Sequence, residues 1–160
     1  QATRSALRST LEAQDMRVLA QGVDGTPRQI LQNFLKHPRS VLLGTSSFWE
    51  GVDLAGESLK VLVLARLPFN VPTEPVFAAR SALYEDPFNQ YALPQAILRF
   101  RQGFGRLIRT KSDKGAVVVL DRRLTSKSYG KAFLNSIPQS AVIKPTLRDM
   151  AGEIARWIGS

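Results

Sequence analysis

The sequence predicts an α/β fold in which a parallel sheet carries helices on both of its faces. Short apolar segments of strand length alternate with amphipathic segments of helical length along the chain, which is typical of this class. The strand candidates, such as residues 61–65, are continuously apolar, as in parallel strands that are buried on both faces. The 160 residues hold no internal repeat and no low-complexity linker, so we expect a single domain over residues 1–160.

The first half of the chain predicts helices and strands in alternation. Leu7 and Leu11 lie four residues apart and give the first helix an apolar side. Thr26, Pro27 and Gln29 form a helix start, because a threonine N-cap with glutamine three residues later makes a capping box and proline suits the first turn. We expect a helix over residues 1–14, a strand over 16–20, a helix that begins after Thr26 and ends at Pro38, and a strand over 41–43.

The second half continues this alternation around one longer helix. Pro94 lies in the expected first turn of that helix, where proline is tolerated. Its buried stripe is expected to consist of Ile97, Phe100, Phe104, Leu107 and Ile108. The other elements expected are a strand over 59–65, a helix near 76–84, a strand over 116–120, and helices over 127–134 and 147–158.

The composition indicates a basic domain without cysteine chemistry. The net charge is +9, with 22 Lys and Arg residues, and an excess of this size favours a polyanionic partner such as nucleic acid or leaves an ordinary basic domain. The absence of cysteine excludes a disulfide, a thiolate zinc site and an iron–sulfur cluster from this chain. No apolar run approaches the roughly 20 residues that span a bilayer, and no signal peptide is recognisable.

A glutamine, two glycines and two arginines are concentrated in residues 102–109. Gln102, Arg106 and Arg109 are spaced four and then three residues apart, so a helix would carry all three side chains on one face. Each glycine costs roughly 1 kcal/mol in a helix interior relative to alanine, yet glycine permits the close approach of another surface. We interpret the run as a site for polyphosphate; the alternative is a solvated basic face of an amphipathic helix.

Residues 44–53 form a second candidate site directly after a predicted strand. Its small hydroxyl residues leave backbone N–H groups accessible to phosphate. Glu50 and Asp53 can accept hydrogen bonds from ribose hydroxyls or hold an arginine, and turn or cap chemistry is the alternative. Trp49 is more readily interpreted as a core residue than as a platform for a base.

Both runs resemble motifs V and VI of the RecA-like helicases of superfamily two. Residues 102–109 match every fixed position of Gln-x-x-Gly-Arg-x-x-Arg. The phrases at residues 47–54, 65–69 and 94–109 resemble the bacterial DinG family, which is related to the XPD-type DNA helicases. The resemblance covers most of residues 17–137.

The resemblance implies a 5′-to-3′ ATP-dependent DNA helicase of the bacterial cytoplasm, active in DNA repair, of which this chain is the second, RecA-like motor domain. It implies ATP and Mg²⁺ held mainly by a first domain of the same polypeptide, a possible iron–sulfur cluster elsewhere in the parent protein, and single-stranded or forked DNA as partner. The residue roles that it implies are γ-phosphate contact for Arg106 and Arg109, coupling of nucleotide state to domain position for Gln102, an ATP-cleft lining of Glu50, Gly51, Asp53 and Gly105, and DNA contacts by Thr45 and Ser46.

The sequence lacks the parts that bind ATP in such a motor. No Gly-x-x-x-x-Gly-Lys-[Ser/Thr] loop and no Asp-Glu-x-His box is present, so we expect no ATP hydrolysis by this chain alone. A stand-alone nucleic-acid-binding module is therefore the main alternative. An unrelated Rossmann-like enzyme is disfavoured, because residues 22–25 lack the Gly-x-Gly-x-x-Gly form.

Two strand ends carry further arginines. Arg66 follows one predicted strand and is expected to contact nucleic acid or to bridge the motor domains; a salt bridge at the strand end is the equal alternative. Asp121, Arg122 and Arg123 follow another, where a local cap with an ion pair is favoured over a DNA contact.

Overall fold

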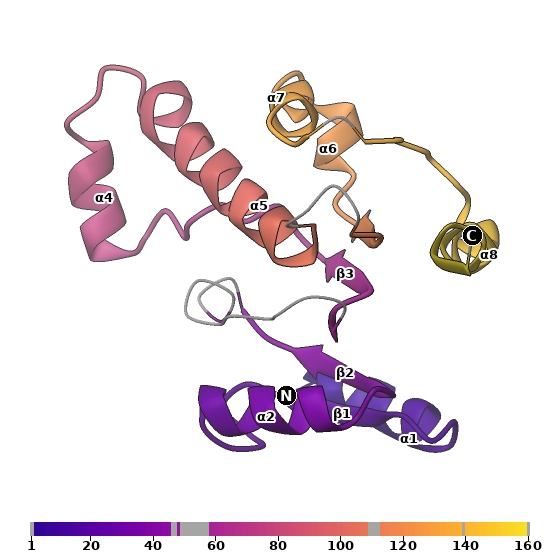
Figure 1. The fold of residues 1–160 in the computed structure, drawn as a ribbon. Coiled ribbons are helices and arrows are strands. Elements are labelled where there is room, and N and C mark those ends of the chain that lie inside the picture. Colours follow the sequence, from indigo (N-terminus) through magenta and orange to yellow (C-terminus); the bar gives the residue numbers. More distant parts are fainter. Residues whose placement is uncertain (1, 46–47, 49–57, 109–112, 139, 160) are drawn as a thin grey trace. The chain divides into compact units, whose positions relative to one another are not determined.

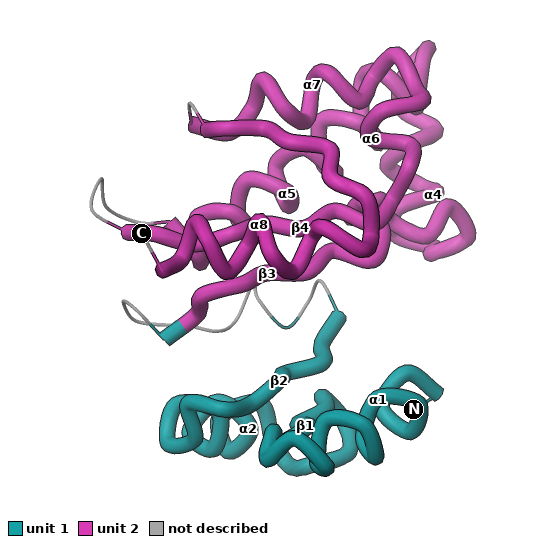
Figure 2. Tube along the Cα trace, turned by 90° about the vertical axis from the view of Figure 1, so that its right-hand side faces the viewer, with its two compact units in different colours: residues 1–58 teal, residues 59–160 magenta. Residues whose placement is uncertain are grey.

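The computed structural model describes residues 2–45, 48, 58–108, 113–138 and 140–159. The chain divides into two compact units, residues 1–58 and 59–160 (Figure 2). The prediction of a single domain over residues 1–160 stays a prediction. The two units are described separately below.

Unit 1 is an α/β segment built on a parallel strand pair. Its strands align in register from the pair Arg17 and Ser40 to the pair Ala20 and Leu43, which confirms the predicted parallel pairing. The elements are α1 (Ala2–Glu12), β1 (Arg17–Ala20), α2 (Pro27–Lys36) and β2 (Ser40–Leu43) (Figure 1).

The start of α2 is the predicted capping box. The Gln29 N–H donates to Thr26 Oγ1 at 3.3 Å, and the Thr26 N–H donates to Gln29 Oε1 at 2.9 Å. These bonds satisfy two backbone donors that a helix start otherwise leaves unpaired. The helix ends at Lys36 with His37 as its C-cap, directly before Pro38, as predicted.

The core of unit 1 lies between α2 and the strands. Ile30 is completely buried, and Phe48 is 6% exposed beside it. Leu19 and Leu42, one from each strand, pack against this pair. The apolar stripe of α2 therefore covers the strand pair, as its spacing predicts.

Unit 2 contains the second parallel strand pair and most of the helices. Leu64 of β3 is opposite Val119 of β4, at the carboxyl ends of both strands. The elements are β3 (Val61–Leu64), α4 (Pro75–Ser81), the π-helical turn η2 (Phe88–Ala92), α5 (Leu93–Leu107), β4 (Ala116–Val119), α6 (Arg123–Ser126), α7 (Gly130–Asn135) and α8 (Leu147–Gly159) (Figure 1).

The core of unit 2 is aromatic. Phe133 of α7 is completely buried and meets Phe100 of α5 edge to face, with ring centroids 5.4 Å apart. Phe69 adds a third ring, 5.8 Å from Phe133. Helix α5 packs on both β3 and β4, and α8 packs on β4, where the Trp157 Nε1–H donates to the carbonyl of Gly115 at 3.0 Å.

The sheet differs from the prediction in its extent and in its burial. In the described residues the strands form two two-stranded sheets, each parallel. Val63 points to the opposite face of β3 from Leu64, and it is 55% exposed while Leu64 is 3% exposed. The expectation of burial on both faces is thus not met at β3, because the described helices cover the Leu64 face more completely.

The helix predicted over residues 127–134 is found as α7, which begins later, at Gly130, and the short helix α6 comes before it. The chain turns between α6 and α7, and at Gly130, the first residue of α7, an added Cβ would lie only 2.0 Å from the carbonyl oxygen of Leu124. Only glycine permits this close approach. This close approach of Gly130 to α6 accompanies the later start of the predicted helix.

Candidate functional site

Helix α5 presents Gln102 and Arg106 on one face. Phe100, Phe104 and Leu107 form the buried side of the helix and fix its rotation about its axis. Gln102 is exposed and Arg106 is half-buried, four residues further along. This spacing places the amide and the guanidinium one above the other, as predicted for this pair.

The helix ends earlier than predicted. Its last residue is Leu107, and Ile108 is the C-cap with an extended backbone (φ −117°, ψ 108°). Ile108 is therefore not part of the buried helical stripe, and α5 does not continue to Arg109. Arg109 lies outside the described residues, so the common face is observed for Gln102 and Arg106 only.

Gly105 leaves open space beside Arg106. An added Cβ at this exposed position would meet no atom within 4 Å. Packing within the described chain therefore does not require glycine here, although glycine weakens a helix by about 1 kcal/mol relative to alanine. A surface or ligand that approaches α5 closely is a physical reason for it.

The loop after β2 is held by a residue that the sequence analysis missed. The Thr45 N–H and the Thr45 hydroxyl both donate to Gln21 Oε1, at 2.9 Å and 3.0 Å. The expectation of an accessible amide is therefore wrong for Thr45. Gln21 directly follows β1, so its place at the same sheet edge as residue 45 was the available signal.

The other predicted residues of this loop lie outside the described residues. They are Ser46, Trp49, Glu50, Gly51 and Asp53. The described part is compact at Phe48, whose N–H donates to the carbonyl of Thr45 at 2.9 Å. An added Cβ at Gly44 would lie 3.1 Å from the Phe48 Cβ, so glycine also accommodates this tight turn.

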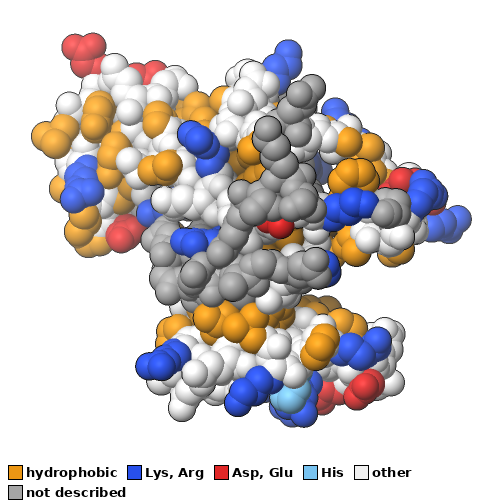
Figure 3. All heavy atoms as spheres, in the orientation of Figure 1, with side chains coloured by type: hydrophobic (Ala, Val, Ile, Leu, Met, Phe, Trp, Pro, Cys, Tyr) orange, Lys and Arg blue, Asp and Glu red, His pale blue; other side chains and the backbone are white. Residues whose placement is uncertain are grey.

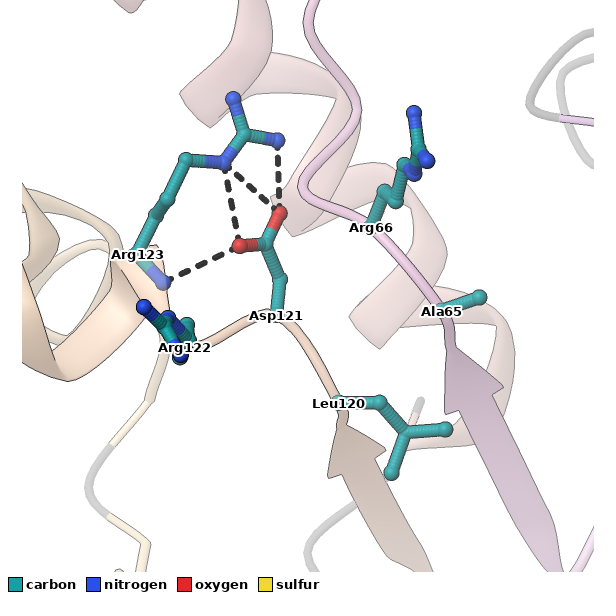
Figure 4. Close-up of a pocket in the computed structure, with 6 residues that line it drawn as sticks. All are labelled: Ala65, Arg66, Leu120, Asp121, Arg122 and Arg123. Atoms are coloured by element: carbon teal, nitrogen blue, oxygen red, sulfur yellow. Dashed lines mark hydrogen bonds and ion pairs between the residues drawn. The ribbon is translucent and has the colours of Figure 1, made fainter.

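Asp121 ties together the loops that follow β3 and β4. Its carboxylate accepts from the backbone N–H of Leu67 at 2.9 Å and from that of Arg123 at 3.0 Å. Arg123 Nη2 also donates to Asp121 Oδ2 at 2.6 Å (Figure 4). The favoured interpretation of a local cap with an ion pair is confirmed.

Electrostatics strengthens this pair. The hydrogen bonds from the Arg123 side chain hold the pKa of the Asp121 carboxyl well below its ordinary value, although burial opposes the shift. The same bonds raise the pKa of Arg123. The Arg123 guanidinium also lies over the Phe69 ring, 5.4 Å from its centroid. Its positive charge therefore makes a cation–π contact within the protein in addition to the ion pair with Asp121.

An open pocket of about 390 Å³ lies at this edge of the sheet, lined by Ala65, Arg66, Leu120, Asp121, Arg122 and Arg123 (Figure 4). Arg66 and Arg122 are exposed, and within the described part of the chain neither guanidinium forms an ion pair. The salt bridge considered for Arg66 is thus not found there. Two arginines of the pocket remain available to an external anion.

On the face that Figure 3 shows, the Lys and Arg side chains of the described residues do not form one dominant basic patch. They are spread across this face, with Asp and Glu between them. Among the described residues, no three His, Cys, Asp or Glu side chains gather in a group that would hold a metal ion. No helix within these residues is both long and apolar enough to cross a membrane.

Comparison with known proteins identifies the class. Residues 1–140 match the model of the helicase C-terminal domain, and this match includes α5 and both sheet edges. The chain therefore belongs to the helicase C-terminal domain family. In the structure, the described part of residues 1–140 has a mixed α/β fold with small parallel sheets (Figure 1).

Individual relatives confirm the resemblance to DinG proteins. The chain is 38% identical over 154 residues to the 3′-5′ exonuclease DinG of Bacillus subtilis, covering 93% of this chain and 16% of that protein. It is 41% identical over 134 residues to the ATP-dependent DNA helicase YoaA of Haemophilus influenzae, covering 81% and 21%. It is 48% identical over 103 residues to the ATP-dependent DNA helicase DinG of Photobacterium profundum, covering 62% and 15%. The chain thus spans about a fifth or less of the length of these relatives.

Proposed function

We propose that this chain is the second motor domain of an ATP-dependent 5′-to-3′ DNA helicase of the bacterial cytoplasm that acts in DNA repair. In this proposal residues 1–160 form one RecA-like domain, which works against a first motor domain of the same polypeptide. The observation that carries the proposal is the face of α5, where Gln102 and Arg106 project beside the open space at Gly105. Family membership and the ATP-dependent helicases among the relatives support it.

The proposed chemical role of this domain is electrostatic. Arg106 and Arg109 stabilise the negative charge that develops on the γ-phosphoryl group during hydrolysis, a contribution of about 10³ to 10⁵ in rate for an arginine finger. Gln102 couples nucleotide state to domain position. Glu50, Gly51, Asp53 and Gly105 line the cleft on this side.

The arginines of this chain suit contact with the γ-phosphate of ATP but cannot by themselves hold the whole triphosphate. Arginines are donors for phosphate oxygens, but the sequence lacks the Walker A lysine and loop that hold the other phosphates. Within the part of the chain that the structure describes, no three His, Cys, Asp or Glu side chains form a group that could hold a metal ion. Accordingly the first domain is proposed to supply the Mg²⁺ ligands and the phosphate cradle, and any iron–sulfur cluster belongs elsewhere in the parent protein.

The proposed DNA track on this domain includes Thr45, Ser46 and Arg66, with single-stranded or forked DNA as the partner. Thr45 can donate to a phosphate only after its bonds to Gln21 are exchanged. Arg66 is already exposed. The net charge of +9 supports a polyanionic partner.

The substitution Arg106→Ala in the complete helicase tests the assignment. ATP hydrolysis should fall by about 10³ or more, because the transferring phosphoryl group loses a cation, while ATP binding is largely retained. Arg101→Ala is the matched control: it removes the same charge from an exposed position of the same helix, on another face, and should leave hydrolysis unchanged. Normal ATPase and unwinding in the Arg106 variant would contradict the finger assignment.

The substitution Gly105→Ala tests the same face without removing a charge. Alanine should stabilise α5 by about 1 kcal/mol, yet lower ATP hydrolysis in the complete helicase, because its methyl group enters the space reserved for the approaching surface. Gly152→Ala in α8 is the control, since an added Cβ there also meets nothing within 4 Å. It should stabilise the protein equally and leave hydrolysis intact. A stand-alone nucleic-acid-binding module would tolerate both changes.

A further inference from the structure

We propose that the pocket at the carboxyl ends of β3 and β4 binds a backbone phosphate of single-stranded nucleic acid through both Arg66 and Arg122. This inference deepens the proposed function, on which its choice of partner rests. It adds Arg122 as a phosphate contact and places both arginines in one site. The sequence analysis had favoured a local structural role for residues 121–123, and the structure assigns that role to Asp121 and Arg123 only.

The topology brings the two arginines to one edge. Strands β3 and β4 are parallel neighbours, and the Leu120 N–H donates to the carbonyl of Leu64 at 2.9 Å. The segments that follow the two strands therefore leave the sheet side by side. Neighbouring strands lie about 4.8 Å apart. Arg66 follows one strand and Arg122 the other, and both line the same pocket (Figure 4).

The charge at this edge remains positive after internal pairing. Asp121 is the acid of the pocket, and it is committed to Arg123, with a side chain only 7% exposed. Figure 4 shows hydrogen bonds that Arg123 donates to the Asp121 carboxylate, and none between that carboxylate and Arg66 or Arg122. Two guanidinium groups are therefore left for an external anion, and their planar forks suit phosphate oxygens.

The backbone at this edge argues against a nucleotide triphosphate as the ligand. Phosphate cradles use free backbone N–H groups, but the N–H groups of Leu67 and Arg123 both donate to Asp121. Recognition here relies on side-chain charge at an open surface. Such contacts position a nucleic-acid backbone and carry no base readout.

The test compares variants of the whole chain for binding to a fluorescent oligothymidylate, measured by anisotropy over a range of salt concentrations. R66Q/R122Q should weaken binding by about tenfold for each arginine at low salt and reduce the magnitude of the salt slope by about 1.4. R66K/R122K keeps both charges and should retain most of the affinity, which controls for misfolding. R80Q/R148Q removes the same charge from exposed positions on α4 and α8 and should change binding much less.

Each outcome decides a different point. Equal losses in R66Q/R122Q and R80Q/R148Q would show that only overall charge matters, and would overturn the pocket while leaving the helicase proposal intact. Added ATP serves as a second ligand: if R66Q/R122Q binds oligothymidylate as the wild type does but binds ATP more weakly, the pocket is a nucleotide site and the proposal is overturned. Failure of the wild-type chain to bind oligothymidylate would overturn the pocket together with the proposed DNA track.

Discussion

The two strand pairs of this protein end in loops of opposite character. At the edge of unit 1, Gln21 accepts both the amide and the hydroxyl hydrogen of Thr45, and Asp24 pairs with Arg4 at 2.7 Å. At the edge of unit 2, Asp121 and Arg123 satisfy each other, while Arg66 and Arg122 have no ion-pair partner in the described residues.

The difference shows that a loop at the carboxyl end of a parallel strand does not bind a ligand merely because of where it lies in the fold. The described groups of the unit 1 edge must break internal hydrogen bonds before they bind a phosphate. At the unit 2 edge, the acidic residue of the pocket, Asp121, pairs with Arg123. Arg66 and Arg122 are not part of this ion pair. The two edges therefore differ mainly in whether charged side chains remain available to a ligand after the internal hydrogen bonds and ion pairs have formed.

The comparison assumes that each unit depends on its own core. Phe133→Ala should lower the free energy of unfolding of unit 2 by about 3–5 kcal/mol, and Ile30→Ala that of unit 1 by about 2–5 kcal/mol, because both side chains are completely buried. Amide hydrogen exchange measures each unit separately. Leu83→Ala, at an 83% exposed position, is the control and should have little effect.

An equal loss of amide protection in both units after either substitution would contradict the assumption that each unit depends on its own core. The two strand pairs would then unfold as one cooperative body. Their edges would have to be treated as parts of one structure.

Asp121→Asn should have the next largest effect. It removes the charge-assisted bonds to Arg123 and should destabilise unit 2 by about 1–3 kcal/mol, measured by urea denaturation. Glu153→Gln breaks the exposed Arg156 pair and should cost about 0.5 kcal/mol or less. Equal effects of the two changes would mean that the Asp121 pair contributes no more than a surface ion pair.

The same pair predicts a pH dependence. The pKa of Asp121 is lowered from its ordinary value of 3.8 in the folded protein, first by the Arg123 side chain. Its stabilising contribution is therefore present above the unfolded pKa and is lost as the pH falls from about 4 towards the lowered folded pKa. Denaturation midpoints between pH 5 and pH 2 should show this loss in the wild type and a smaller one in Asp121→Asn.

Gln21→Ala should have the smallest effect. The bond pair to Thr45 is exposed, so its loss should cost about 0.5 kcal/mol, but the Thr45 amide should exchange faster with solvent. Gln32→Ala, at an exposed position of α2, is the control. If the Thr45 amide exchanged at an unchanged rate, Gln21 would not be the group that protects it. The proposed difference between the two edges would then lose its basis.

Local side-chain chemistry made part of the fold predictable. The capping box at Thr26 and Gln29 and the end of α2 before Pro38 depend on residues within a few positions of each other. The apolar face of α5 follows from spacing alone, as Phe100, Phe104 and Leu107 show. The helical motif at Gln102 and Arg106 follows from the same spacing.

Features that depend on distant partners were not predictable in this way. The exposure of Val63 depends on which elements cover β3, and the break between α6 and α7 depends on the carbonyl of Leu124 facing Gly130. No glycine or proline directly follows the end of α5 at Leu107, so the sequence did not mark this end. The bond between Gln21 and Thr45 required the strand pairing to be known first.

The bond from the Leu67 N–H to Asp121 also bears on the order of folding. It joins residues 54 positions apart, whereas Gln21 and Thr45 are separated by 24. Doubling the length of a closing loop adds about 0.6 kcal/mol of entropic cost, and contacts that are distant in sequence slow folding. The edge with the available arginines should therefore assemble after the edge of unit 1, so a chain still emerging from the ribosome would complete its internally paired loop before its anion pocket exists.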